Sequence, residues 1–228
     1  MQTPTSETYA ELQEAYTHFN RELFAGQLPE CLITLQRRKF TYGYLSYNRF
    51  VNMDGETAAE IAMNPAYFAT RSIEDLLSTL VHEMSHLWQF TSGRPGRGRY
   101  HNKEWADKMK KIGLHPSNTG QPGGKETGDQ MDHYIIDDGL FQKSTRRLLT
   151  EEFHFSWYDR FPAMELAEDK STLPILEKLV SLGIDQPGKK ETRKINSKVK
   201  FTCPSCHANA WGKSSLKIAC SDCNLPMQ

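Results

Sequence analysis

One motif constrains the fold of this chain more than any other: His82-Glu83-Met84-Ser85-His86, the pattern H-E-x-x-H. On an α-helix, residues four apart lie on the same face, so both imidazoles can reach a single metal ion. The Glu between them can then act as a general base toward a water molecule. The pattern is typical of zinc-dependent peptidases. We therefore predict that His82 and His86 bind zinc and that Glu83 is catalytic.

The segment around this motif carries the signals of an amphipathic helix. Ser72 followed by Asp75 resembles a capping box, and Gly93 provides a stop. The apolar residues between them recur at helical spacing: Ile73, Leu76, Leu77, Leu80, Val81, Met84, Leu87 and Trp88. They fill an arc opposite the two histidines, which are predicted to lie outside the apolar stripe, with Glu83 at its margin. The alternative is an ordinary amphipathic helix with two surface histidines.

A third ligand is needed, because a catalytic zinc takes three protein ligands and leaves one position for water. His101 is the best candidate. It follows a Gly/Arg-rich loop at 93–100 and precedes Asn102, which is predicted to cap a second helix that ends at Gly113. A His at a helix entry after a flexible turn can fold back on the first helix. The alternative is a solvated loop histidine.

The motif and its surroundings resemble a known family. The H-E-x-x-H motif, fourteen intervening residues and then His101-Asn102-Lys103-Glu104-Trp105 are similar to the SprT-like metalloprotease domain, the family that includes Spartan-type DNA–protein crosslink proteases. The resemblance covers residues 8–114 well, and the C-terminal cysteines fit it too. In the segment before the H-E-x-x-H motif, the residues that resemble the family are Phe19-Asn20-Arg21-Glu22-Leu23-Phe24, Gly43-Tyr44 and Ile61-Ala62-Met63-Asn64-Pro65. It implies that His101 is the third ligand. In that family a Gly usually follows this His, so Asn102 is a departure that bears on how the loop approaches the metal.

A second metal site is predicted near the C-terminus. Cys203-Pro204-Ser205-Cys206 and Cys220-Ser221-Asp222-Cys223 are two C-x-x-C pairs thirteen residues apart. Four thiolates close a tetrahedral site without an open position, which is structural zinc. Two disulfides are the alternative, but nothing in the sequence suggests an oxidising compartment. We expect two zinc ions, one catalytic and one structural.

The charge of the chain is unevenly distributed. The formal net charge is +0, yet residues 189–228 carry eight Lys/Arg against two Asp/Glu. A basic segment joined to a zinc ribbon predicts DNA as a partner, and a solvated flexible linker is the alternative. Trp211 is expected to pack over the ribbon. The N-terminus lacks the features of a signal peptide and no stretch approaches a membrane span, so we expect a cytoplasmic or nucleoid-associated protein without a membrane partner.

The order of the expected elements predicts an α+β fold: a small antiparallel sheet with helices carrying the H-E-x-x-H zinc site, plus a C-terminal zinc ribbon. The expected helix spans 7–24, and the expected strands span 31–36, 40–46 and 57–63, broken at Asn48 and Asp54-Gly55. The predicted domains are 5–160 (SprT-like metalloprotease), 161–200 (helical and basic connector, with a helix in 164–183) and 201–228 (zinc ribbon). The resemblance further implies that the strand before the metal helix is an exposed edge, to which an extended peptide can pair.

Residues 115–160 give weaker signals. Pro122-Gly123-Gly124 is a turn, and residues 131–136 are expected to form a short strand that closes over the site. His133 or Tyr134 could stabilise an oxyanion there, although ordinary loop and core roles are more frequent for such residues.

The sequence as a whole predicts a zinc-dependent endopeptidase that cleaves protein substrates, plausibly DNA-associated or DNA-crosslinked ones. One alternative is a non-proteolytic DNA-binding or regulatory protein with an idle H-E-x-x-H site. Another is a different zinc hydrolase, such as an amidase.

Overall fold

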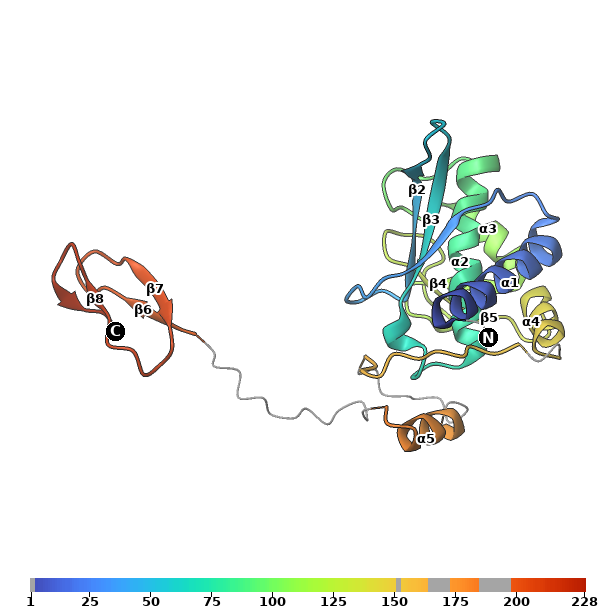
Figure 1. The fold of residues 1–228 in the computed structure, drawn as a ribbon. Helices are drawn as coiled ribbons and strands as arrows, with labels where there is room; N and C mark the ends of the chain where they lie inside the picture. The colour runs from blue at the N-terminus through green and yellow to red at the C-terminus, as the bar shows by residue number, and fades with distance from the viewer. Residues whose placement is uncertain (1–2, 151–152, 164–172, 185–197) are drawn as a thin grey trace. The chain divides into compact units, whose positions relative to one another are not determined.

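The computed structural model describes residues 3–150, 153–163, 173–184 and 198–228. The chain divides into two compact units, Met1–Pro187 and Gly188–Gln228 (Figure 1). The predicted domain limits stay a prediction, and most of the predicted connector lies outside the described residues. None of the described helices is long and apolar enough to cross a membrane.

The first helix, α1 (Pro4–Phe24), begins earlier than the expected residue 7 because of its cap. The Thr3 and Ser6 side chains and backbones form a reciprocal capping box, with Pro4 in the first turn. The inward face is the predicted one and consists of Leu12, Ala15, Tyr16, Phe19 and Leu23. The helix ends at Ala25, which adopts a left-handed conformation with φ of 55°.

A three-stranded sheet follows, in the order β1-β3-β2. Its strands are β1 (Leu32–Leu35), β2 (Gly43–Val51) and β3 (Thr57–Met63). The hairpin β2–β3 is antiparallel as predicted, but β1 runs parallel to β3. Asn48 does not end the second strand as expected: it lies inside β2 with φ of 51°, where the register shifts between Ser46 and Phe50. Asn tolerates this conformation, so the strand continues through a bulge.

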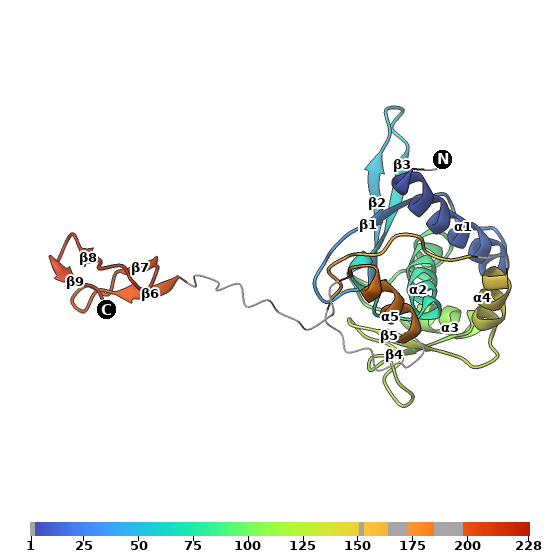
Figure 2. The same ribbon diagram turned by 60° about the horizontal axis from the view of Figure 1, so that its bottom comes forward.

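The two predicted metal helices are α2 (Ile73–Ser92) and α3 (Lys103–Ile112), and both begin and end where the caps predict. The Ser72 hydroxyl accepts a hydrogen bond from the Asp75 N–H, and the Asn102 side chain accepts one from the Trp105 N–H. Helix α2 lies at the centre of its unit and contacts the sheet, α1, α3 and a later helix, α4 (Leu140–Thr150) (Figure 2). Because it is covered on most sides, the side of α2 outside the apolar stripe is also buried.

Two further elements complete this unit around α2. Strand β4 (Leu114–Ser117) pairs antiparallel with β5 (Asp132–Ile135), which lies within the strand expected at 131–136. Helix α4 (Leu140–Thr150) was not predicted. It packs on α1, where Phe141 stacks on Phe19 with ring centroids 5.6 Å apart. A short 3-10 helix, η1 (Pro65–Tyr67), precedes α2, and α5 (Leu173–Ser181) lies in the predicted helical segment 164–183, of which 164–172 is outside the described residues.

The second unit consists of two hairpins, β6–β7 and β8–β9. Their strands are Val199–Thr202, Asn209–Gly212, Ala219–Cys220 and Leu225–Pro226. The prediction for Trp211 was wrong, because its side chain is 62% exposed. The side chains nearest Gly212 are instead those of Leu216, Ile218 and Phe201, which a Cβ at Gly212 would meet.

Candidate functional site

The three predicted histidine ligands come together in one cluster. His82 and His86 lie one turn apart on α2, and His101 returns at the entry to α3. The Nε2 atoms of His86 and His101 are 3.0 Å apart. One ring nitrogen of each of the three histidines lies within 4.8 Å of the others, so the cluster could hold a metal ion.

The position of His101 is fixed by Gly128. The two residues exchange backbone hydrogen bonds of 2.8 and 3.2 Å, and His101 Nδ1 lies 3.0 Å from the Gly128 carbonyl oxygen. Because a carbonyl only accepts, Nδ1 carries the proton and Nε2 keeps its lone pair. Such an outer hydrogen bond orients a metal-binding histidine. Sequence reasoning missed Gly128, since a glycine in a loop rich in glycine carries no specific signal.

Trp105 forms the floor of the histidine cluster. Its side chain is fully buried. The indole stacks on His86 at an interplanar angle of 14°, and it meets His101 and His82 edge-on with ring centroids 4.5 and 5.0 Å away. This apolar floor limits the directions from which water reaches the imidazoles.

Burial keeps the three imidazoles neutral, which is the form that binds a metal. It lowers the pKa of His86 to about 3 and that of His82 well below the ordinary value, with neighbouring histidines adding to the effect. The pKa of His101 is lowered for the same reason. Three neutral nitrogen donors on an open cleft fit a catalytic zinc site.

Glu83 lies beside the free edge of strand β2. A Cβ built on Gly43 would be 3.4 Å from Glu83 Cγ and 2.9 Å from the Ala62 carbonyl oxygen, so only glycine allows this close approach. Burial raises the pKa of Glu83 to about 8, and a backbone hydrogen bond from Leu45 opposes the effect. The histidines were predicted to lie outside the apolar stripe of α2, and this side of the helix is covered as well. His82 and Glu83 are both buried, because β2, β5 and Trp105 cover this side of α2.

The site opens into a cleft of about 810 Å³. Strand β2 forms one wall, and the loop around Tyr100 and residues 129–133 form the other. The lining includes His82, Glu83, His86 and His101 and three basic side chains, Arg38, Lys39 and Arg99. The implied peptide-pairing edge was assigned to the wrong strand. The strand before α2 is β3, which is central because β1 and β2 flank it, so the edge strand at the cleft is β2.

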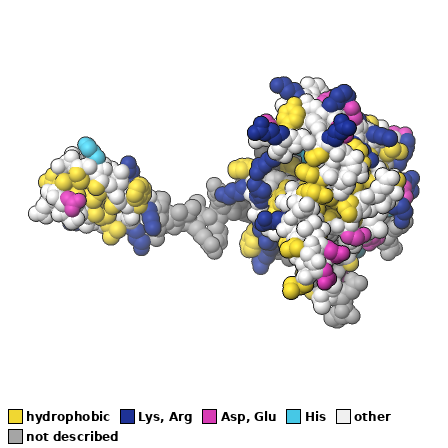
Figure 3. Space-filling model, turned by 90° about the horizontal axis from the view of Figure 1, so that it is seen from above, with side chains coloured by type: hydrophobic (Ala, Val, Ile, Leu, Met, Phe, Trp, Pro, Cys, Tyr) yellow, Lys and Arg dark blue, Asp and Glu magenta, His cyan; other side chains and the backbone are white. Residues whose placement is uncertain are grey.

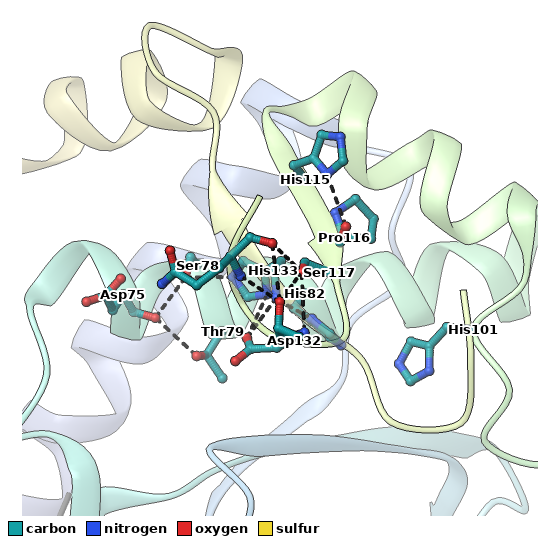
Figure 4. A network of polar contacts seen from close by, with 12 residues as sticks. Asp75, Ser78, Thr79, His82, His101, His115, Pro116, Ser117, Asp132 and His133 are labelled. Atoms are coloured by element: carbon teal, nitrogen blue, oxygen red, sulfur yellow. Dashed lines mark hydrogen bonds and ion pairs between the residues drawn. The ribbon is translucent and has the colours of Figure 1, made fainter. Parts of the chain in front are cut away.

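Of the two candidates for stabilising an oxyanion, His133 is held by contacts with other protein side chains (Figure 4). His133 Nδ1 lies 3.1 Å from His82 Nδ1, and His133 Nε2 lies 2.8 Å from Ser78 Oγ. Both nitrogens therefore face protein groups, and neither is left for a substrate oxygen. Tyr134 stacks on His115 at a centroid distance of 4.8 Å.

The four C-terminal cysteines form the second cluster. Cys203 and Cys206 follow β6, Cys220 is the last residue of β8 and Cys223 follows it, and the four sulfurs lie within 4.8 Å of one another. All described cysteines are free, and the four clustered sulfurs could hold a metal ion. Backbone hydrogen bonds from Cys206 and Ser205 lower the pKa of the Cys203 thiol, which favours the thiolate that metals bind.

Comparison with known proteins bears on the histidine cluster. The model of the SprT-like family matches residues 12–122, which include the whole histidine cluster. An uncharacterised protein of Salmonella typhimurium, described as lying in the mucB 3' region, is 61% identical over 59 residues, which are 25% of this chain and 80% of that protein. The family is consistent with a zinc metallopeptidase-like domain. The chain belongs to the SprT-like family.

Proposed function

We propose that this protein is a zinc-dependent endopeptidase that cleaves protein substrates, in particular proteins bound or crosslinked to DNA. The observation that carries the proposal is the placement of Glu83 beside the three-histidine cluster, in a cleft walled by the free edge of β2. The family match supports the coarser assignment to metallopeptidase-like domains.

The reaction divides among residues of the cleft. His82, His86 and His101 would hold the zinc ion, which would supply a Lewis acid for the scissile carbonyl and lower the pKa of the attacking water. Glu83 accepts the proton of that water and later donates it to the leaving amine.

The substrate is positioned by the backbone of β2. Among the described residues, β2 pairs with β3 along one edge only. Residues 42–47 line the cleft, where the other edge of β2 has no strand partner in the described part of the chain. An extended peptide can add here as a further strand through main-chain hydrogen bonds. Because these bonds do not read side chains, we expect cleavage of unfolded or extended segments with low sequence selectivity.

A single substitution tests the catalytic part. Glu83→Gln should retain both zinc ions and lose roughly 100- to 10,000-fold in cleavage rate, since it removes the general base. Glu74→Gln is the matched control, because Glu74 lies in the first turn of the same helix and not in the cleft. Absence of any Glu83-dependent cleavage of unfolded proteins would favour another zinc hydrolase, such as an amidase. If the cellular function survives Glu83→Gln, the site is idle and the protein acts by binding.

The DNA part of the proposal concerns residues 189–228. In the described portion of this segment, Lys198, Lys200, Lys213 and Lys217 are exposed, and so is Trp211. Apolar and basic side chains lie next to one another on the ribbon, with few acidic ones (Figure 3). Phosphate contacts from such lysines give binding that is largely independent of sequence.

Truncation after Gly188 tests this assignment. With about four Lys/Arg–phosphate contacts, the logarithm of affinity should fall against the logarithm of salt concentration with a slope of roughly −3 to −4. The truncated chain should lose DNA binding and any DNA stimulation of cleavage of a DNA–protein crosslink, and keep its histidine-bound zinc. Undiminished DNA binding would move the interface to the arginines of the loop at 93–100.

A further inference from the structure

A chain of hydrogen bonds leads from the backbone of α2 to the ligand His82 (Figure 4). The Asp75 carbonyl oxygen lies 2.9 Å from Ser78 Oγ, which lies 2.8 Å from His133 Nε2. His133 Nδ1 in turn lies 3.1 Å from His82 Nδ1. Ser78 and His133 take no part in the reaction described above, and both side chains are buried.

The direction of every bond in this chain follows from its first member. A backbone carbonyl has no hydrogen, so Ser78 must donate its hydroxyl proton to Asp75. The Ser78 oxygen is then left only as an acceptor toward His133, whose Nε2 must carry the proton. A neutral imidazole has one proton, so His133 Nδ1 has a lone pair and accepts from His82 Nδ1–H.

The position of this proton determines the state of the other His82 ring nitrogen, Nε2. With its proton held at Nδ1, His82 keeps a free lone pair on Nε2, the nitrogen available to a metal ion. We propose that His133 is a positioning residue that locks His82 in this tautomer and orientation for zinc binding. The inference rests on the proposed zinc site, which it deepens. It does not depend on the reaction being proteolysis.

The fold explains how a residue 51 positions away in the chain reaches His82. The β4–β5 pairing places His133 opposite Pro116, and Asp132 Oδ1 accepts the His133 backbone N–H at 2.8 Å. The segment 128–133 thus orients two ligands by the same rule: the Gly128 carbonyl holds Nδ1–H of His101, and His133 holds Nδ1–H of His82.

Two substitutions at His133 separate hydrogen bonding from packing. His133→Leu removes the acceptor and keeps bulk, and it should weaken zinc binding at the histidine site roughly 10- to 100-fold. His133→Asn restores an acceptor oxygen near the position of Nδ1 and should recover most of that affinity. His115→Leu, on the paired strand β4 and outside the cleft, is the control and should leave affinity unchanged. Affinity is measured on the full chain with Co²⁺ and Zn²⁺ in competition. Only the thiolate site absorbs strongly in the near-ultraviolet when it holds Co²⁺, so its occupancy can be separated from that of the histidine site.

Nitrogen-15 spectra of the histidine rings provide the second measurement and need no variant that could misfold. In the zinc-loaded wild-type protein we expect protons on His82 Nδ1 and His133 Nε2. A proton on His82 Nε2, unchanged zinc affinity in His133→Leu, or equal losses in the Leu and Asn variants would each overturn the inference. None of these measurements uses cleavage, so a protein without peptidase activity could still support the inference, and an active peptidase could still refute it.

Discussion

Asn102 joins three segments of the histidine site, and its replacement tests how the site is held together. Its Oδ1 accepts the Trp105 backbone N–H at 3.1 Å, which caps α3, and the Gln89 Nε2–H at 2.7 Å. Its Nδ2 donates to the Arg94 carbonyl oxygen at 2.8 Å. The residue directly after His101 therefore ties α2, the loop and α3 to one another.

The three bonds give the size of the effect. Loss of a helix cap costs about 1 kcal/mol, and each of the two other hydrogen bonds contributes about 1 kcal/mol or less. Because Asn102 is half-buried, water replaces part of what is lost. We therefore expect Asn102→Ala to lower the free energy of unfolding by about 2–3 kcal/mol. Asn102→Gly, which restores the residue usual in the family, should cost less, because glycine is within a few tenths of a kcal/mol of Asn at a cap.

Urea unfolding followed by far-ultraviolet circular dichroism measures these differences. A chelator should keep the histidine site empty, since zinc bound to the folded state would add its own stabilisation. Lys103→Ala is the control: the Lys103 side chain is 82% exposed in its ion pair with Asp107, so its loss should cost at most about 0.5 kcal/mol. Stability of Asn102→Ala within about 0.5 kcal/mol of wild type, or a greater loss in Asn102→Gly, would refute the reasoning.

Three further predictions concern the metals and one buried lysine. The purified chain should hold two zinc ions, and a chelator should remove the histidine-bound ion first, because that site is open and the thiolate site is closed; metal analysis showing one ion or fewer would contradict this. His101→Ala should lose the zinc of the histidine site while His115→Ala keeps it, as read by metal content. Burial against Phe24 lowers the pKa of Lys108 to about 8 in the folded protein. The unfolded chain therefore binds the Lys108 proton more tightly than the folded chain does, and the charged lysine lowers the free energy of unfolding below pH 8. The stability of Lys108→Met relative to wild type should therefore fall as the pH rises from 7 to 10, and a difference that stays constant over this range would contradict the reasoning.

The helices of the site could be predicted with their ends, because a cap is a local interaction. Ser72 and Asn102 each bond to a backbone group three residues later, and Gly113 ends α3 with φ of 97°. At Gly113 a Cβ would meet the Phe141 and Leu140 backbone nitrogens at 2.7 and 2.8 Å. Glycine is therefore required both by the positive φ and by the close approach of this backbone. Helix α4 was missed although Phe141, Thr145 and Leu148 recur at helical spacing. Its exposed residues are mostly charged, and its short apolar stripe was not recognised.

The full pairing of the strands in the sheet could not be predicted from local sequence patterns. The existence and order of the three strands follow from composition and turns, although β2 continues past Asn48. The parallel pairing of β1 with β3, however, depends on which edge of β3 the hairpin leaves open. That choice decides which strand faces the cleft. The error about the peptide-binding edge therefore came from topology and not from the assignment of strands.

The same distinction applies inside the site. The motif identifies His82 and His86 because one helix fixes their spacing, and the helix entry identifies His101. What orients two of these rings is a segment more than twenty-five residues further on, from Gly128 to His133. A carbonyl oxygen belongs to no residue type, so the bond from His101 to Gly128 leaves no mark in the sequence. His133 does leave one, but a histidine that accepts from another histidine cannot be told by spacing from one that faces a substrate. The hydrogen bond that Ser78 donates to the Asp75 carbonyl oxygen is what distinguishes a His133 that accepts from His82 from one that faces a substrate.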